Sequence, residues 1–290
     1  MFSPWMLAGW LSTAVAGDDP WIAPPQTTNV YVASVGERFA NFVGTDLTPK
    51  AVQSPIYNVG GKVYVRHGLG SNMDFSIDAP FSRAWASGGT SSGLYQPTMG
   101  VGLLQAELRR RWFGQDAPLS ASTRLAVRSG VLHRSSRGRL TNLGEGTTDV
   151  GVGVGVGRLS IAGKSFVTLD AGATYWYRSA LEDDVPADEV TWSSNLTFST
   201  SSKFGFGFAS SGLHRLGGQN LGAVSVVDAD NQWAALNAQQ IKVGGRFSLY
   251  SSERFPSMSL SVLRAVWARN NPIDTTVVEI GMGWDIRRNN

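Results

Sequence analysis

The sequence predicts an all-β chain, a transmembrane antiparallel up-and-down β-barrel of about twelve strands. Three observations lead to this fold class. Apolar and polar residues alternate with period two over stretches of more than ten residues. The expected turns between these stretches are alternately short and long. No run of eighteen apolar residues occurs, which excludes a membrane protein built from helices.

The clearest alternation lies in the expected hairpin formed by residues 148–161 and 164–178. Its first strand places four valines on one face and four glycines on the other: Val150, Val152, Val154, Val156 and Gly151, Gly153, Gly155, Gly157. Both strands exceed the roughly 5–6 residues of a typical globular strand. A tilted strand needs about 9–11 residues to cross a bilayer, so their length indicates a membrane-spanning barrel.

The expected strands follow one another along almost the whole chain. They cover residues 29–43, 52–66, 72–85, 98–113, 120–132, 148–161, 164–178, 190–200, 203–212, 236–250, 257–269 and 274–287. Turns after even-numbered strands are short and those after odd-numbered strands are mostly long, which is the arrangement of bacterial outer-membrane barrels. An even number of strands places both termini on the short-turn, periplasmic side.

Two of these strands have a poor pattern, so ten or fourteen strands remain open. Strand 29–43 is irregular around Glu37 and Arg38. In strand 257–269, Arg264 shares a face with Leu260 and Val262, which predicts a β-bulge there.

The last strand has the sequence VVEIGMGWDI and resembles the C-terminal signal of bacterial outer-membrane barrels. It departs from that pattern by ending in residues 287–290 rather than in an aromatic residue. At the level of architecture, the chain therefore resembles a Gram-negative outer-membrane β-barrel of about twelve strands. The resemblance implies a bacterial outer-membrane location, with the lipid bilayer and lipopolysaccharide as surroundings.

The first 28 residues are expected to lie outside the barrel, which covers residues 29–290. Residues 1–16 resemble a signal peptide, with an apolar core and an A-x-A ending at Ala14–Ala16 that suits cleavage before Gly17. No Lys or Arg precedes Arg38, so a retained apolar N-terminus stays open. Residues 17–28 are rich in proline and are expected to form a flexible periplasmic extension.

Alternation also separates the two faces of the barrel. Apolar residues expected to face lipid are Phe75, Ile77, Leu104, Leu108, Leu125, Val127, Phe204, Phe206, Phe208, Ile241, Val243, Val278, Ile280 and Met282. Tryptophans and tyrosines fall near strand ends, where aromatic girdles meet the headgroups.

The opposite face is polar and basic, and it carries the residues expected to line the lumen and set selectivity. They are Lys62, Glu107, Arg109, Arg111, Arg124, Arg128, Lys242 and Arg246. Basic side chains in a pore attract anions, so the working hypothesis is passive diffusion of small polar or anionic solutes. Arginines 109, 111, 124 and 128 resemble the basic lumen of the narrow twelve-stranded channels for acidic oligosaccharides.

Two alternatives to a channel remain open. Cross-strand pairs of Glu107 with Arg124 or Arg128, and of Lys62 with Asp78, would neutralise a closed lumen. The barrel would then be an anchor or subunit of an envelope complex, with protein partners or further copies of itself. The segment 213–235 is expected to be a long loop that constricts the lumen or docks a partner.

The second alternative is an enzyme. His133 and Ser135 share one strand face, an arrangement that resembles the His-x-Ser pair of outer-membrane phospholipase A and lipid A deacylase. The resemblance implies that Ser135 is the nucleophile and His133 its base. Ser136 stands where those families have asparagine, and the third member stays open among Asn142, Glu145 and Asp149. Hydrolysis is therefore the less favoured hypothesis.

Composition excludes several further classes of function. The net charge of +3 is too small to predict nucleic-acid binding. The chain lacks cysteine, and its three histidines have no metal-site spacing, so neither a metal nor a cofactor is expected. Acidic residues in 179–189 suit either divalent cations or simple solvation, and solvation is preferred.

Overall fold

The computed structural model describes residues 21–44, 46–88, 95–113, 118–130, 143, 146–163, 165–179, 186–200, 204–217, 237–250 and 256–287. The strands are β1 (Thr27–Val43), β2 (Pro49–Gly68), β3 (Met73–Ala86), β4 (Thr98–Val101), β5 (Leu104–Arg111), β6 (Leu119–Ser129), β7 (Thr148–Ala162), β8 (Ser165–Arg178), β9 (Glu189–Ser199), β10 (Phe204–Arg215), β11 (Gln239–Leu249), β12 (Ser257–Arg269), β13 (Asn271–Pro272) and β14 (Thr276–Arg287). No helix in these residues is long and apolar enough to span a membrane.

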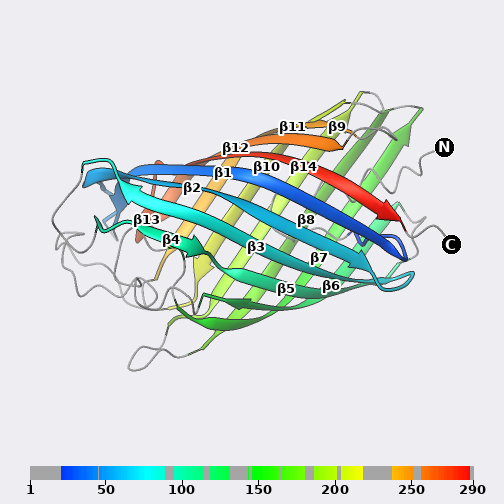
Figure 1. Cartoon of the computed structure of the whole chain (residues 1–290), viewed down its shortest axis with the longest axis horizontal. Helices are drawn as coiled ribbons and strands as arrows, with labels where there is room; N and C mark the ends of the chain where they lie inside the picture. The colour runs from blue at the N-terminus through cyan, green and yellow to red at the C-terminus, as the bar shows by residue number, and fades with distance from the viewer. Residues whose placement is uncertain are drawn as a thin grey trace.

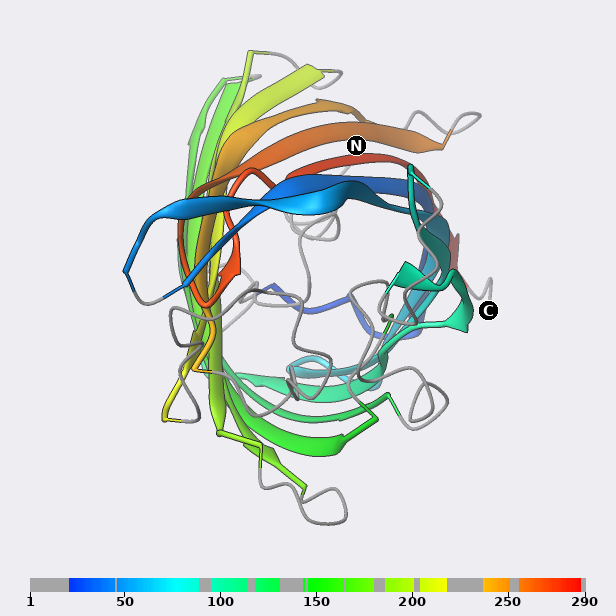
Figure 2. The ribbon, with the colours of Figure 1, turned by 90° about the vertical axis from the view of Figure 1, so that its left-hand side faces the viewer.

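The strands form one closed antiparallel barrel (Figures 1 and 2). Sequential strands are neighbours, and β1 closes the ring because it pairs with both β2 and β14. In the described part of the chain the ring holds twelve strands, since β4 and β5 run as one interrupted strand and β13 is a two-residue addition. The predicted fold class and strand number are confirmed.

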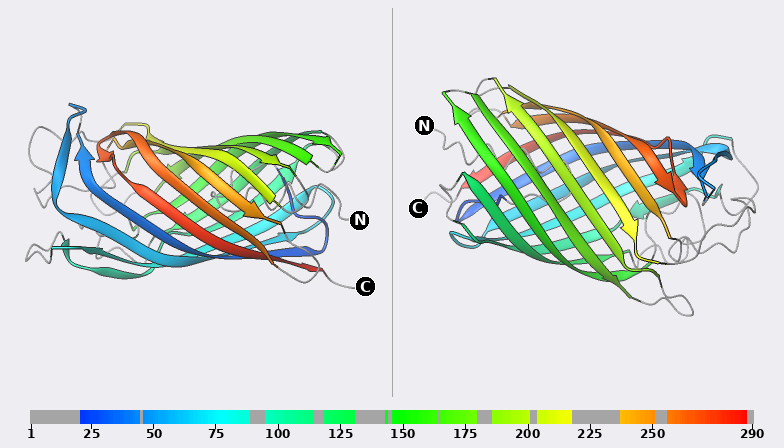
Figure 3. Two further views of the ribbon diagram at one scale, coloured as in Figure 1. Left: turned by 90° about the horizontal axis from the view of Figure 1, so that it is seen from above. Right: turned by 180° about the vertical axis from the view of Figure 1, so that it is seen from behind.

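The two ends of the barrel differ in their connections. Connections 69–72, 112–118, 163–164, 200–203 and 250–256 lie at one end, which we call the turn end. The opposite end, called the loop end, carries the longest connections, including 130–147 and 216–238 (Figure 3). Thr27 pairs with Arg287, so the barrel begins and finishes at the turn end.

Burial follows the predicted alternation of the strands. In β7 the valines are exposed on the outside, and the glycines between them are buried. Of the fourteen residues expected to face lipid, all are exposed except Ile241, which is half-buried. A continuous apolar outer surface of this kind would be unstable in water, and it matches the hydrocarbon core of a bilayer.

The register is irregular at three places among the described strands, and in the pair of β1 and β2 it shifts between Phe39 and Asn41. The other two are bulges of one residue. Ile241 pairs with Trp267 and Lys242 with Ala265, so Val266 is the extra residue on β12, and Arg264 faces outward. This strand does carry a bulge, as predicted, but the bulge lies at Val266 and leaves Arg264 on the outer face with Leu260 and Val262. A second extra residue separates β4 from β5 opposite Pro80 of β3, because Phe81 pairs with Val101 whereas Asp78 pairs with Gln105.

Near the loop end, Asp274 fastens the connection between β13 and β14 to β1. Its carboxylate accepts hydrogen bonds from the backbone N–H groups of Ala40 at 2.9 Å and Asn41 at 3.0 Å. Partial burial raises the pKa of Asp274, but these hydrogen bonds outweigh it and hold the pKa below its usual range.

The segment before β1 differs from the expectation of a flexible extension over residues 17–28. Residues 1–20 lie outside the described part, so the signal peptide stays a prediction. From Trp21 onward the chain packs inside the turn end, where Trp21, Ile22 and Ala23 are buried. β1 then begins at Thr27, two residues earlier than predicted.

Candidate functional site

The interior of the barrel is filled by charged side chains that are almost fully buried. Among the described residues, eight arginines and six carboxylates fall in this group: Arg66, Arg109, Arg111, Arg124, Arg128, Arg178, Arg215, Arg246, Asp74, Glu107, Asp149, Asp170, Glu189 and Glu279. A buried charge is costly unless it is paired, so the arrangement of these groups decides what the interior can hold. Some of them form a cluster near the turn end, and others form a second cluster at the loop end.

The turn-end cluster is centred on Asp74 of β3, which is fully buried. One carboxylate oxygen accepts a hydrogen bond from Nε of Arg109 at 2.9 Å, and the other accepts one from its NH2 group at 3.0 Å. Arg66 of β2 lies 3.8 Å away. The backbone N–H of Ala23 donates to the same carboxylate at 2.8 Å. Asp74 therefore ties the segment before β1 to the barrel.

Residues 21–26, which we call the N-terminal segment, lie across the interior at the turn end. The carbonyl of Trp21 accepts a hydrogen bond from Arg66 at 3.2 Å, and the guanidinium of Arg111 lies 5.6 Å from the indole centroid. The same indole belongs to a buried cluster with Leu159, Phe166 and Tyr250 from β7, β8 and the end of β11. The N-terminal segment contacts opposite walls of the barrel, and it therefore narrows the lumen at this end.

Gly68 lets the N-terminal segment lie against the end of β2. A Cβ atom at this position would be 2.0 Å from the carbonyl oxygen of Pro24, which no side chain could tolerate. The backbone N–H of Gln26 donates to the carbonyl of Gly68 at 3.0 Å, which fixes this close approach.

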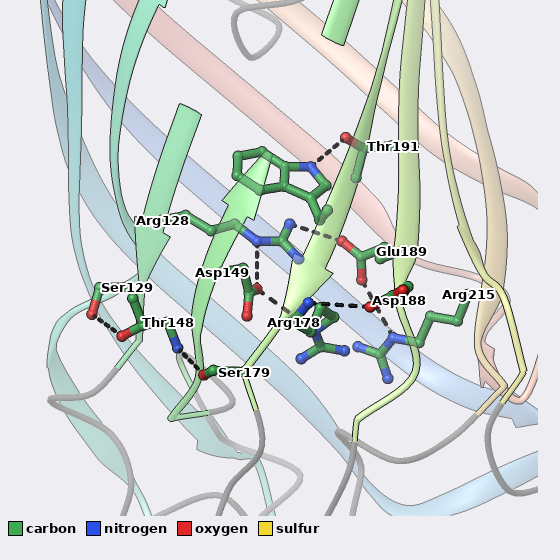
Figure 4. A network of polar contacts seen from close by, with 11 residues as sticks. Arg128, Ser129, Thr148, Asp149, Arg178, Ser179, Asp188, Glu189, Thr191 and Arg215 are labelled. Carbon is green, nitrogen blue, oxygen red and sulfur yellow. Dashed lines mark hydrogen bonds and ion pairs between the residues drawn. The ribbon is translucent and has the colours of Figure 1, made fainter. Parts of the chain in front are cut away.

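The loop-end cluster joins five successive strands, β6 to β10 (Figure 4). Register places Arg128 opposite Asp149, Asp149 opposite Arg178, and Glu189 opposite Arg215. Arg128 binds Asp149 and Glu189, each at 2.8 Å, and its guanidinium lies 4.3 Å from the centroid of the Trp176 ring. These alternating signs across neighbouring strands are the favourable arrangement for a sheet.

Two further arginines, Arg178 and Arg215, belong to the loop-end cluster. Nε of Arg178 lies 3.6 Å from Asp149, and Nε of Arg215 lies 3.3 Å from Glu189. Asp188 turns its carboxylate to the outer face of the same wall, where it accepts hydrogen bonds from the exposed Tyr175 hydroxyl and from the backbone N–H of Arg178. Three arginines and two carboxylates of the described residues therefore form one network of opposite charges.

The glycines of β7 make room for large interior side chains. A Cβ atom at Gly151 would lie 2.7 Å from the Trp176 ring, and one at Gly153 would lie 2.6 Å from Nε of Arg124. The alternation of valine and glycine thus gives β7 an apolar outer face and an inner face flat enough for these side chains.

A cavity of about 190 Å³ opens beside the loop-end cluster. Its lining combines the three arginines and two carboxylates with Thr147 and with three leucines: Leu103, Leu143 and Leu213. No group of three or more His, Cys, Asp or Glu in the described residues could hold a metal ion.

The predicted lumen residues are all interior, but they do not act as one cluster. Arg109 and Arg111 contact the turn-end groups, whereas Arg128 belongs to the loop end. Arg124 donates to the carbonyl of Val154 at 3.2 Å, and Arg246 is buried on β11.

The ion pairs differ from those expected between neighbouring strands. Lys62 binds Glu279 of β14 at 2.8 Å instead of Asp78. Lys242 lies 3.4 Å from Glu37 of β1. Arg128 is paired with Asp149 and Glu189 rather than with Glu107, which accepts a hydrogen bond from Gln105. The interior curvature of a closed barrel brings together strands that are not neighbours.

Several residues of the loop-end cluster are absent from the predicted set of lumen residues. Glu189 and Arg215 were assigned to loops, although they begin and end strands. Arg178 could have been found, because it continues the polar face of Thr168, Asp170 and Thr174. His133 and Ser135, the candidate hydrolase pair, lie outside the described residues, as do Asn142 and Glu145.

Comparison with known proteins supports the fold class. No protein-family model matches the sequence, and no curated protein matches it either. The crystal structure of an outer membrane channel from Pseudomonas putida F1 is similar with a TM-score of 0.65 and 16% identity, over 91% of this chain and 97% of that chain. This likeness defines the fold as that of a bacterial outer-membrane β-barrel.

Two porin structures are similar over comparable lengths but at lower scores. The NanC porin has a TM-score of 0.49 and 10% identity, over 88% of this chain and 98% of that one. The KdgM porin, in complex with disordered oligogalacturonate, has a TM-score of 0.45 and 8% identity, over 89% of this chain and 98% of that one.

Proposed function

We propose that this chain is an outer-membrane channel for passive diffusion of small polar or anionic solutes through a narrow lumen. The observation that carries the proposal is a closed barrel whose outer face is apolar and whose inner face is charged. A polar interior inside an apolar outer surface provides a path on which a hydrated solute avoids the hydrocarbon. The similar structure from Pseudomonas putida F1 is described as an outer membrane channel, which supports this choice.

The packing of the interior indicates that only small solutes would pass. The side chains of both charged clusters are almost fully buried, and the N-terminal segment occupies the turn end. A path of this kind lies between side chains and differs from the wide aqueous pore of a large general porin.

The lumen arginines would favour anions. Among the described residues, the eight buried arginines outnumber the six buried carboxylates. In a narrow pore an excess of positive charge lowers the energy of an anion and raises that of a cation. Selectivity would arise mainly where Arg124 and Arg128 face the interior of β6.

The orientation follows from the sorting of the connections. The turn end, with Thr27 and Arg287, would face the periplasm, and the loop end would face the cell exterior. Three exposed arginines on the outer face, Arg38, Arg83 and Arg264, would bind phosphates of lipopolysaccharide.

The test is single-channel conductance of the purified chain in a planar bilayer, with a salt gradient to measure selectivity. We expect discrete conductance steps and a reversal potential that indicates anion preference. The double variant Arg124→Gln/Arg128→Gln should shift the reversal potential toward zero, whereas Arg158→Gln, on the outer face of β7, should leave it unchanged.

Two results would contradict the proposal. A correctly folded barrel that never conducts would instead support an anchor or a subunit of an envelope complex. A double variant with the reversal potential of the parent protein would remove the assigned role of Arg124 and Arg128 in selectivity.

A further inference from the structure

Two carboxylates on the lumen wall form no ion pair with any of the described residues. They are Asp78 of β3 and Glu107 of β5, on the loop-end side of the pair formed by Asp74 and Arg109. We infer that Asp78 and Glu107 bind a primary ammonium group, such as that of a small alkylamine. The inference goes beyond the proposed function, because it adds a cation-binding point to a lumen proposed to favour anions, and it holds whether or not the barrel conducts.

The register of β3 and β5 brings the two carboxylates together. Asp78 lies opposite Gln105 and Ser76 lies opposite Glu107, so the two acids are diagonal neighbours on the inner face. Long side chains in such positions are within reach of one another. The amide nitrogen of Gln105 donates a hydrogen bond to Oε1 of Glu107, which turns this carboxylate toward the Asp78 position. Asp78 also interacts electrostatically with Glu107, in agreement with this closeness.

Each of the two carboxylates has an oxygen atom that no described protein group satisfies. Glu107 is 4% exposed, and its Oε2 atom is buried without a hydrogen-bond partner. The Oδ1 atom of Asp78 is also buried without a partner. A buried acceptor without a donor is costly, and two buried charges of the same sign add their mutual repulsion. A cation with N–H donors would relieve both costs.

The lysine that acts on Asp78 is held by another carboxylate. Nζ of Lys62 lies 2.8 Å from Oε2 of Glu279 and 5.7 Å from the centroid of the Tyr31 ring. The hydroxyl of Tyr31 donates to Oε1 of the same glutamate at 2.8 Å. Lys62 is therefore drawn toward β1 and β14. Three carboxylates, those of Asp78, Glu107 and Glu279, share this one lysine.

The acceptors at this place suit an ammonium group better than a metal ion. A primary ammonium has three N–H donors and no acceptor. Oδ1 of Asp78, Oε2 of Glu107 and the side-chain oxygen of Gln105 would supply three acceptors, two of them charged. Hydrogen bonds between charged partners are the strong ones. As stated above, no group of three or more His, Cys, Asp or Glu in the described residues could hold a metal ion.

The bulge beside Asp78 keeps the site open to the lumen. β3 pairs with β5 only as far as Asp78 and Gln105, and the register shifts beyond them at Pro80. Asp78 is half-buried, whereas Asp74, on the same face of β3, is fully buried. An ammonium group can therefore reach the carboxylates while the alkyl chain that carries it stays in the lumen.

The experiment is ligand-detected NMR, which measures weak binding, on the full-length protein in detergent and in a buffer without amines. The probe is butylammonium. Tetramethylammonium has the same charge but no N–H donor, and butanol has the alkyl chain but no charge. We expect butylammonium to bind, and each of the other two to bind at least about tenfold more weakly. This comparison needs no variant, so misfolding cannot affect it.

Variants then locate the site. Asp78→Asn and Glu107→Gln keep the shapes of the side chains, and each should weaken butylammonium binding about tenfold or more. The double variant should be no less stable than the parent in denaturant unfolding, because it removes two charges that lack an ion pair. Glu37→Gln is the matched control, since Glu37 already lies 3.4 Å from Lys242 and should not affect binding.

The outcomes separate this inference from the proposed function. Absence of butylammonium binding, or binding that the double variant leaves unchanged, would overturn the inference even if the barrel conducts. Tetramethylammonium binding as tightly as butylammonium would reveal a site for charge alone, and displacement of butylammonium by an equal concentration of Ca²⁺ would reveal a metal site; either result would overturn the assigned ligand. Binding that the double variant abolishes, in a barrel that never conducts, would support the inference and contradict the channel alone.

Discussion

Asp74 offers the sharpest test of how the interior is held together. Asp74→Asn preserves the shape of the side chain but removes its negative charge. Arg109 would lose one of its two hydrogen bonds to this residue, and Arg66 would lose a nearby negative charge. Removing one partner of a buried ion pair typically costs about 3–5 kcal/mol, because the remaining charge stays buried without compensation. We expect a loss of stability in this range.

The same substitution should also affect conduction. The Asp74 carboxylate accepts the backbone N–H of Ala23, so its change loosens the N-terminal segment from the barrel. We therefore expect Asp74→Asn to raise the single-channel conductance while it lowers stability. A variant that is merely less stable would unfold earlier but conduct as the parent protein does.

The assay is denaturant unfolding of the barrel in lipid vesicles, followed by tryptophan fluorescence, together with bilayer conductance. Asp46→Asn is the control, because Asp46 forms an exposed ion pair with Lys50 at 3.3 Å and should leave the unfolding midpoint unchanged. A stability of Asp74→Asn within about 1 kcal/mol of the parent would refute the view that Asp74 compensates two buried arginines.

Three further predictions concern other parts of the barrel. Gly153→Val should destabilise the barrel by about 1–3 kcal/mol in the same unfolding assay, because its side chain would collide with Arg124, whereas Gly36→Ala has open space and should be neutral. Trp21→Ala should raise single-channel conductance, because it empties part of the turn end; unchanged conductance would place the narrowest point elsewhere. Asp274→Ala should lower stability at pH 7, and by progressively less as the pH falls below about 4: the pKa of Asp274 is depressed in the folded state, so its contribution is present in full above its ordinary value near 4 and is lost as the pH falls through the lower folded-state value. A difference between the two proteins that persists unchanged at low pH would contradict this assignment.

The strands and their faces could be predicted from the sequence because they depend on local alternation. A strand with one apolar face has a single arrangement that exposes that face to lipid. The alternation in β7 is therefore enough to predict that its valines face outward and its glycines inward. The bulge in β12 was predicted only approximately, because Arg264 keeps its outward position and the extra residue is Val266. Strand ends were less certain, since Glu189 and Arg215 carry no signal that distinguishes a strand end from a loop.

The contacts across the interior depend on closure of the ring, which local alternation does not describe. Lys62 has Asp78 nearby on the next strand, yet it binds Glu279, on a strand that becomes close only when β1 joins β14. The N-terminal segment illustrates the same limit. Its prolines and short length predict a flexible extension outside the barrel. The segment lies inside instead, because the backbone N–H of Ala23 donates to the buried carboxylate of Asp74, which is paired with Arg109. The charges that fill the barrel therefore do two things at once: they stabilise each other, and they determine which backbone and which solute can share the interior with them.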